Sequence, residues 1–430
     1  MKRNSRLPML LLSLSLLVTA MTGQVAAGSK PPISVTFWHD WTGDGGEAVL
    51  EVVNAFNKSR TDIVVNATVT PDLGTKLLAS IAGKVPPDVV LFDRYMTGQY
   101  ASRDGLTPLD PYIARDKTDP GAFFEACWNE TVYAGKVYSI PFETNSRVLM
   151  YNKRLFREAG LDPQKPPETW DDLVRYSQAL TKRDDKGRLT QVGFVPIWNG
   201  VSLVHYLWQS GGDVFNSDAT RVAFNGPEGV KALEWVVSLV KYYGYENLVS
   251  FASGFGSHMT DPFYLGKVAM KSDGCWMLSD MRRYAPELVA RDLGLAPLPK
   301  GTQRATIAGG FSLVIPRGAA NADAAWEFIK FVVSKDAQVL FSRRVGTIPA
   351  LKAAALDPRV SGDPLLKPFI DAMAHARYRP VHPAFPEVES YIYQAMDKAV
   401  NGEMSPKAAL DWAADRAQRV LDRYNRHLRR

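Results

Sequence analysis

The sequence predicts an α/β protein built from two lobes. Its 430 residues exceed the roughly 250–300 residues at which one hydrophobic core stops growing, so two units are expected. Strand-like and helix-like segments alternate through the first hundred residues, and this order predicts a parallel sheet with helices on both faces. A second α/β stretch extends from residue 136 to about Pro299, and we expect it to form the second lobe.

The first stretch combines both kinds of periodicity. Residues 33–38 alternate as a strand does, whereas Val49, Val52, Val53 and Phe56 share one helical face. The predicted order is a strand at 33–38, a helix at 47–56, a strand at 63–69, a helix at 73–82 and a strand at 88–92.

The remainder of the chain contains further strands and a helical C-terminal third. Strands are predicted at 136–141, 147–151, 193–197 and 309–316, and helices at 153–159, 170–181, 323–333, 336–343 and 408–424. No repeat, low-complexity tract or disordered linker separates the two stretches. We therefore expect the chain to cross between the lobes through ordered segments.

Residues 1–27 are predicted to be a cleaved signal peptide. Lys2, Arg3 and Arg6 precede a short apolar run at 7–18, and Val25-Ala26-Ala27 places small residues before a plausible cleavage point. No later apolar run is long enough to span a bilayer, and no cysteine lies near the cleavage point to carry a lipid. The mature chain is expected in a bacterial periplasm, without membrane insertion.

The net charge and the two cysteines indicate what the mature chain does not bind and how its thiols are used. Removing the three basic residues of the signal reduces the formal net charge from +6 to +3, which is too small and too scattered to predict nucleic-acid binding. Cys127 and Cys275 each stand beside a tryptophan, so we expect two buried free thiols, with a disulfide as the alternative in an oxidising compartment.

The end of the strand at 88–92 is the most informative point in the chain. Asp93, Arg94 and Tyr95 follow it directly, and in α/β sheets ligands bind just beyond the carboxyl ends of strands. A carboxylate beside a guanidinium can accept and donate hydrogen bonds to a hydroxyl-rich molecule. The alternative interpretation is an ordinary surface ion pair.

Seven segments, in order along the chain, resemble one known family. They are VTFWHDWTG, PPDVVLFDRYMTGQYASRDGLTPLD, GKVYSIPFETNSRVLMYNKRLF followed by PPETWDDL, GGDVFN, FYLGKVAMKSDGCWMLSDM, IAGGFSLVIPRGAANADAAWEFIKFVVSKDAQ and RVGTIPA. Together they span nearly all of the mature chain. They are similar to the periplasmic solute-binding proteins of ABC importers, specifically the sugar-binding group of extracellular solute-binding protein family 1 that includes the maltodextrin-binding protein.

The resemblance implies a type II periplasmic-binding-protein fold. Each lobe would be a mainly parallel sheet flanked by helices, with the ligand in the cleft between the lobes. The first lobe would comprise 28–143 plus 309–347, and the second 144–308 plus 348–430. The crossings between them would lie at 142–146, 307–310 and 347–350, and hinge bending there would close the cleft on its ligand.

The resemblance also implies which residues contact the ligand. Asp93 and Arg94 match a charged pair that contacts sugar hydroxyls in the family, and Trp276 matches an aromatic residue that stacks on sugar. Further predicted ligand-binding residues are Trp38, His39, Trp41, Asn145, Trp198, Gly309 and Gly310. Arg344, Arg377, Tyr378 and His382 are weaker candidates at the cleft edge.

Several of these residues have a structural alternative. Trp38 follows the strand alternation, so a place in the cleft wall or the core explains it at least as well as a ligand contact does. His39 could equally be a satisfied structural histidine. Trp41 lies in a glycine-rich turn, where a stacking role and a packing role are equally plausible. The turn HDWTGDGG lacks the lysine that the maltodextrin-binding protein has there, so the same sugar specificity is not implied. Glu143 and Arg147 would either face the cleft or pair with each other.

The predicted function is a substrate-binding receptor of an ABC importer that captures a di- or oligosaccharide. Its partners would be the transmembrane permease subunits with their cytoplasmic ATPase, and the receptor is expected to be a monomer that needs no metal or other cofactor. One alternative keeps the fold and binds a glycerol phosphoester, a polyol or a glycosylated osmolyte, because Arg94, Arg147 and Arg344 could form a phosphate site.

A secreted glycoside hydrolase is a remote alternative. Asp40, Asp93, Glu143 and Glu389 supply enough carboxylates for such chemistry, which needs two of them flanking the bound sugar. None stands in a hydrolase-like motif, and no metal, nucleotide or nucleophile motif is present in the sequence. The sequence therefore favours binding over catalysis.

Overall fold

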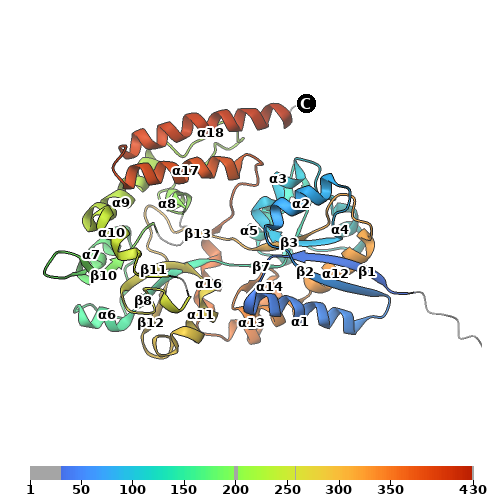
Figure 1. The fold of residues 1–430 in the computed structure, drawn as a ribbon, viewed down its shortest axis with the longest axis horizontal. Coiled ribbons are helices and arrows are strands. Elements are labelled where there is room, and N and C mark those ends of the chain that lie inside the picture. The colour runs from blue at the N-terminus through green and yellow to red at the C-terminus, as the bar shows by residue number, and fades with distance from the viewer. Residues whose placement is uncertain (1–30, 198–201, 257, 429–430) are drawn as a thin grey trace, which may run out of the picture.

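The computed structural model describes residues 31–197, 202–256 and 258–428. Figure 1 shows two α/β lobes side by side, joined by extended segments near the centre of the molecule. Two long C-terminal helices, α17 (Phe385–Val400) and α18 (Pro406–Leu428), lie along one edge and reach from the second lobe toward the first.

The first lobe is organised around a five-stranded sheet of order β2-β1-β3-β14-β6. Its strands are β1 (Ile33–His39), β2 (Ile63–Val69), β3 (Val89–Asp93), β14 (Phe311–Val314) and β6 (Ile140–Pro141). Its main helices are α1 (Gly43–Ser59), α2 (Leu73–Ala82), α12 (Ala322–Val332) and α13 (Lys335–Val345). The apolar stripe of α1 predicted from the sequence is buried as expected.

The second lobe contains a sheet of order β12-β8-β11-β10-β9. Its strands are β12 (Leu293–Ala296), β8 (Arg147–Asn152), β11 (Val268–Gly274), β10 (Leu189–Phe194) and β9 (Lys182–Arg183). The helices are α6 (Lys153–Glu158), α7 (Trp170–Leu180), α8 (Leu203–Gln209), α9 (Pro227–Tyr243), α10 (Tyr245–Ala252) and α11 (Met277–Tyr284).

The fourth strand of the first sheet and the second of the second sheet run against their neighbours for the same reason. β14 pairs antiparallel with β3 and β6, and β8 pairs antiparallel with β11 and β12. Each of these strands follows a crossing from the other lobe, so it enters its sheet at the cleft edge and runs away from it. The other main strands run toward the cleft, and their carboxyl ends therefore line it.

The crossing segments contact one another. β7 (Glu143–Thr144) pairs with β15 (Ile348–Pro349), and Asn145 forms a bridge with Gly309. Beyond β15, α14 (Lys352–Ala355) and α15 (Pro358–Ser361) still pack on α13 of the first lobe. These contacts favour a final crossing after α15, later than the boundary at 347 that the sequence analysis predicts.

Two predicted strands differ from the structure. Residues 136–141 are not one strand: β5 (Lys136–Val137) forms a hairpin with β4 (Val132–Tyr133), and only β6 joins the main sheet. The hairpin turn uses positive φ at Ala134 and Gly135, which matches the right-handed twist of a tight hairpin. The strand predicted at 193–197 instead begins at Leu189 and ends at Phe194, two residues before Pro196.

The short elements complete the lobes and their connections. They are α3 (Thr97–Ala101), α4 (Asp110–Asp116), α5 (Glu125–Asn129), β13 (Thr306–Ile307), α16 (Lys367–Ala372) and β16 (Ala376–Arg377), with β13 pairing parallel to β16. Cys127 and Cys275 are buried and free, as predicted. No helix within the described ranges is both long and apolar enough to cross a bilayer.

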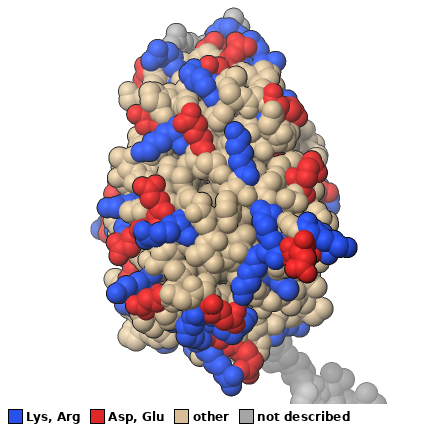
Figure 2. Space-filling view, turned by 90° about the vertical axis from the view of Figure 1, so that its left-hand side faces the viewer, with Lys and Arg blue, Asp and Glu red and all other residues tan. Residues whose placement is uncertain are grey.

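The surface of the second lobe carries charges of both signs. Figure 2 shows lysine and arginine side chains interspersed with aspartate and glutamate on this face, around an uncharged middle. Such a mixed surface does not form the continuous basic patch that nucleic-acid binding uses.

Candidate functional site

The first-lobe edge of the cleft begins at the carboxyl end of β3. Asp93 caps the turn that follows and forms an ion pair with Arg379, with 2.8 Å between Oδ1 and Nη2. The Arg379 guanidinium also lies over the Tyr95 ring, 4.1 Å from its centroid. Asp93 keeps 37% of its side chain exposed, so one face of this carboxylate remains open to a ligand.

Arg94 is fully buried and its donors are engaged by protein. Nε donates to Glu130 Oε2 at 2.9 Å, Nη1 to the Glu143 carbonyl at 2.9 Å and Nη2 to the Gly309 carbonyl at 2.8 Å. Glu143 and Gly309 belong to two different crossings between the lobes. Arg94 therefore ties the end of β3 to both crossings, and in this conformation it has no exposed surface for a ligand.

We call Arg94 and the groups it bonds, the Glu130 carboxylate and the carbonyls of Glu143 and Gly309, the first-lobe clamp. The Glu143 side chain and Gly310 pack tightly beside it. Glu143 Oε1 accepts a hydrogen bond from the Phe311 amide at 2.7 Å, whereas Oε2 has no partner among the described residues. Burial raises the pKa of Glu143 to about 8, a rise that Arg94 and the Phe311 amide only partly oppose. Gly310 has a φ of +132°, and a Cβ there would lie 2.5 Å from the Glu143 carbonyl oxygen, so only glycine fits.

The aromatic and histidine residues after β1 pack largely against the first lobe. His39 is completely buried, and burial lowers its pKa, with the Trp41 backbone opposing. The Trp41 ring meets Phe311 and Phe341 edge-on, with centroids 5.0 and 5.2 Å away. Trp38 is half-buried and contacts the core beneath α2. His39 is therefore buried in this conformation, although neither of its ring nitrogens has a hydrogen-bond partner among the described residues, and Trp41 packs against the first lobe.

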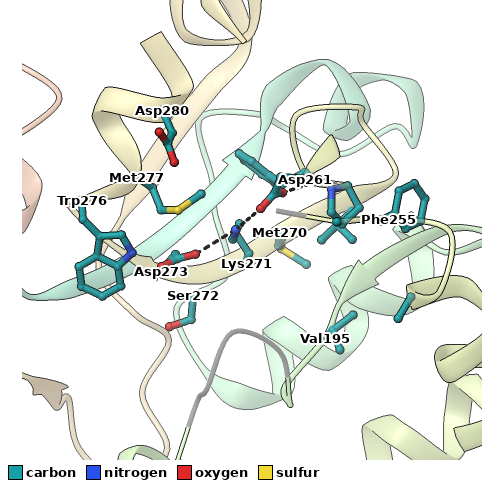
Figure 3. Close-up of a pocket in the computed structure, with 15 residues that line it drawn as sticks. Val195, Phe255, Asp261, Met270, Lys271, Ser272, Asp273, Trp276, Met277 and Asp280 are labelled. Carbon is teal, nitrogen blue, oxygen red and sulfur yellow. Dashed lines mark hydrogen bonds and ion pairs between the residues drawn. The ribbon is translucent and has the colours of Figure 1, made fainter. Parts of the chain in front are cut away.

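The second-lobe edge contains a cavity of about 520 Å³, within the roughly 300–1,000 Å³ typical of small-molecule sites. It extends along β11 and beneath the segment that follows α10. Figure 3 shows Trp276 and Phe255 at opposite ends of it, with Lys271, Ser272 and Asp273 between them. Trp276 is half-buried and immediately precedes α11, so part of its ring faces the cavity.

Arg147 connects this cavity with the crossing. Its guanidinium lies over the Trp276 ring, 5.2 Å from the centroid, and its Nη1 is buried with no hydrogen-bond partner among the described residues. Burial lowers the pKa of Arg147 and Asp273 opposes that change. Arg147 thus stacks on Trp276, and Glu143 binds the Phe311 amide instead, so the two residues do not form the pair that the sequence left open.

The structure separates the remaining predicted site residues by their exposure. Asp93 and Trp276 retain exposed surface on opposite lobes, whereas Arg94, Gly309 and Gly310 form the clamped crossing. Asn145 is half-buried beside Gly309. Trp198 lies outside the described residues. A larger groove of about 1270 Å³ lies between α5 and residues 373–382 and is lined by three of the weaker cleft-edge candidates, Arg377, Tyr378 and His382. None of the stronger candidates lines it, whereas Trp276 lines the smaller cavity, so we take the cavity at Trp276 as the better candidate.

Sequence reasoning missed Arg379, Glu130 and Lys271. Arg379 follows two residues that were weak candidates, but nothing local marks its contact with Asp93, which is far away in the sequence. Lys271 did carry a signal: it and Asp273 are charged positions inside a strand whose residues are all buried. Burying an unpaired charge in such a strand would cost folding free energy, so paired charges there are typical of a functional site.

The described residues contain no group of three or more His, Cys, Asp or Glu side chains placed to hold a metal ion. The polar groups of the cleft are carboxylates, guanidiniums, one ammonium and hydroxyls, which suit hydrogen bonding to a polyol.

Comparison with known proteins identifies the class. Residues 39–339 match the family model of bacterial extracellular solute-binding proteins, and the chain belongs to this family. It is a solute-binding receptor of an ABC importer, with the two-lobed type II fold.

Individual relatives span nearly the whole chain. The sn-glycerol-3-phosphate-binding periplasmic protein UgpB of Pectobacterium atrosepticum is 25% identical, over 93% of this chain and 94% of its own. The structure of CpMnBP1 with mannotriose bound is similar with a TM-score of 0.81 and 29% identity, covering 90% of this chain and all of that one. The cyclic α-maltosyl-1,6-maltose binding protein of Arthrobacter globiformis is 30% identical with a TM-score of 0.75, covering 91% and 99%.

Proposed function

We propose that the protein is a periplasmic receptor that captures an uncharged di- or oligosaccharide by closure of its two lobes and presents it to a membrane permease. The observation that carries this proposal is the cavity at Trp276, which combines aromatic and aliphatic walls with hydroxyl and carboxylate groups. Sugars present apolar C–H faces and polar hydroxyl edges, so such a cavity matches both. The names of the structural neighbours, which include mannotriose and maltosyl ligands, support the same class.

Capture without catalysis is part of the proposal. The relatives are binding proteins, and two carboxylates of the first-lobe edge are ion-paired: Asp93 with Arg379, and Glu130 with Arg94. A sugar recovered chemically unchanged after long incubation supports this assignment, whereas any hydrolysis product contradicts it.

The receptor is further proposed to act as a monomer after removal of residues 1–27, with a permease driven by a cytoplasmic ATPase. N-terminal sequencing of the exported protein should begin at Gly28, and its mass in solution should equal one chain. A retained leader or a stable dimer would contradict these two points.

A glycerol phosphoester is the second candidate ligand. It is favoured by Arg147 Nη1 beside Trp276, which has no hydrogen-bond partner among the described residues, and by the ligand for which UgpB is named. Melting temperatures measured with mannobiose, mannotriose, maltose, maltotriose and glycerol 3-phosphate separate the two candidates, because a ligand that binds only the native state raises the melting temperature. If only the phosphoester raises it, the sugar proposal is wrong.

A further inference from the structure

The second-lobe cavity contains a nearly buried cluster of one lysine and two aspartates. Lys271 Nζ lies 3.0 Å from Asp261 Oδ2 and 2.9 Å from Asp273 Oδ2, with all three side chains nearly buried. Burial alone would lower the pKa of Lys271, but the two carboxylates outweigh it and raise the pKa. One cation between two anions leaves the cluster with a net negative charge, and Asp280 adds another carboxyl to the cavity wall.

Both carboxylates of the cluster are also held by the backbone. Asp261 Oδ1 accepts a hydrogen bond from the Phe263 amide at 2.8 Å, and Asp273 Oδ1 accepts one from the Gly274 amide at 2.8 Å. Figure 3 shows Lys271 between the two acids. The ammonium charge is therefore already compensated, and an incoming anion would have to break a satisfied cluster to use it.

Ser272 also lines the cavity, but its side chain points to the face of β11 opposite Lys271 and Asp273 (Figure 3), because successive side chains of a strand alternate. The residue is 8% exposed, and its buried Oγ has no hydrogen-bond partner among the described residues. A buried hydroxyl without a hydrogen-bond partner lowers the stability of the folded state, and binding a group that hydrogen-bonds to it removes that cost. A ligand hydroxyl in the cavity would supply that partner, and this observation points to a polar ligand independently of the charges.

The rest of the cavity wall is apolar. Phe255, Phe263, Met270 and Met277 line it together with Trp276, and these side chains offer flat or adaptable surfaces to C–H groups. The cavity thus combines apolar walls with polar groups from both faces of β11, the Lys271 cluster on one face and Ser272 on the other. A pyranose ring likewise combines apolar faces with hydroxyl groups around its edge.

From these observations we infer that the cavity is a recognition subsite for one uncharged, hydroxyl-bearing sugar unit, in which the Asp261–Lys271–Asp273 cluster disfavours phosphorylated and carboxylated ligands. The inference rests on the proposed function and adds to it the residues that select against an anion. It assigns to Ser272 a direct hydrogen bond to the sugar.

The first experiment compares Ser272→Ala with Ser312→Ala by titration calorimetry, using the neutral sugar of the panel that gives the largest rise in melting temperature. Ser312 is the matched control, because its hydroxyl is also buried without a partner but lies in β14 of the other lobe. Ser272→Ala should weaken binding about three- to tenfold, the range expected for one hydrogen bond. Ser312→Ala should leave the affinity unchanged, and equal affinities in all three proteins would overturn the role of Ser272.

The second experiment compares Asp261→Asn with Asp292→Asn, titrating each with the same sugar and with glycerol 3-phosphate and glucose 6-phosphate. Asp292 lies in the same lobe and is ion-paired with Arg157, but it does not line the cavity. Asp261→Asn removes one negative charge from the cluster, so it should improve phosphate-ester binding about fivefold relative to the neutral sugar. The control should not change that ratio, and an unchanged ratio in Asp261→Asn would overturn the role of the cluster.

Different experimental outcomes would refute the sugar-receptor function and the subsite. A wild-type protein that binds a phosphoester and no neutral sugar refutes the proposed function itself. A wild-type protein that binds a neutral sugar, with Ser272→Ala and Asp261→Asn both behaving as wild type, refutes only the subsite.

Discussion

The two edges of the cleft use their charged residues in opposite ways. On the first lobe, the arginine that follows β3 is buried, and its donors reach Glu130 and the two crossings. On the second lobe, a charge cluster lines an open cavity, beside an unpartnered hydroxyl and an aromatic ring. Whether a charged pair at the end of a strand can touch a ligand therefore depends on what is buried against it.

The largest expected effect concerns the first-lobe clamp. Arg94→Met should lower the free energy of unfolding by about 3–5 kcal/mol, because it removes the partner at 2.9 Å from buried Glu130, leaving only Arg379 at 3.5 Å, and frees two crossing carbonyls. Denaturant unfolding measures this loss. Arg317→Met, which breaks an exposed pair with Asp104, should cost less than about 1 kcal/mol. Similar losses in both variants would show that Arg94 is no more structural than a surface arginine.

The next prediction uses the pH dependence of Glu143. Its folded pKa of about 8 is raised above its unfolded value, so its contribution is fully favourable at low pH and is lost as the pH rises through 8. Between pH 6 and 8 this loss amounts to about 2 kcal/mol. Glu143→Gln should remove that part of the pH dependence, as measured by unfolding at the two pH values. A variant with the same slope as wild type would mean that Glu143 does not titrate in this range.

The second-lobe edge should respond in affinity rather than stability. Trp276→Ala should weaken sugar binding by roughly 1–3 kcal/mol with little change in fold, the scale found for truncated aromatic anchors. Calorimetry and circular dichroism measure the two quantities separately. Trp412→Ala, on α18 and outside the cavity, should bind as wild type does. Wild-type affinity in Trp276→Ala would remove this residue from the site.

The smallest expected effect concerns the exposed face of Asp93. Asp93→Asn keeps the size of the side chain but loses the charge that strengthens its hydrogen bonds, so sugar affinity should fall by about 1 kcal/mol. Calorimetry on the same sugar tests this prediction. An unchanged affinity would leave the second-lobe cavity as the main recognition surface and would assign Asp93 to the ion pair with Arg379.

Local periodicity was sufficient for much of the fold. The strand at 63–69 and the helix at 73–82 have the bounds that their hydrophobic patterns predict, and the type II fold follows from the order of segments. The site was harder, because its decisive contacts are long-range. The contacts of Arg94 with Glu130 and of Asp93 with Arg379 join residues 36 and 286 positions apart, and no pattern of spacing reveals such pairs. The same holds for β5, whose pairing depends on backbone conformation at Ala134 and Gly135 rather than on side-chain alternation.

The contacts of Arg94 have a mechanical consequence. One guanidinium bonds the carbonyls of Glu143 and Gly309, so two of the connecting strands cannot pivot independently unless those bonds break. Because these two strands are coupled, they should bend together as one hinge. The relative motion of the lobes is thereby reduced toward a single rotation. For a permease that contacts both lobes, the open and closed receptor would then differ in one quantity, the angle of that rotation.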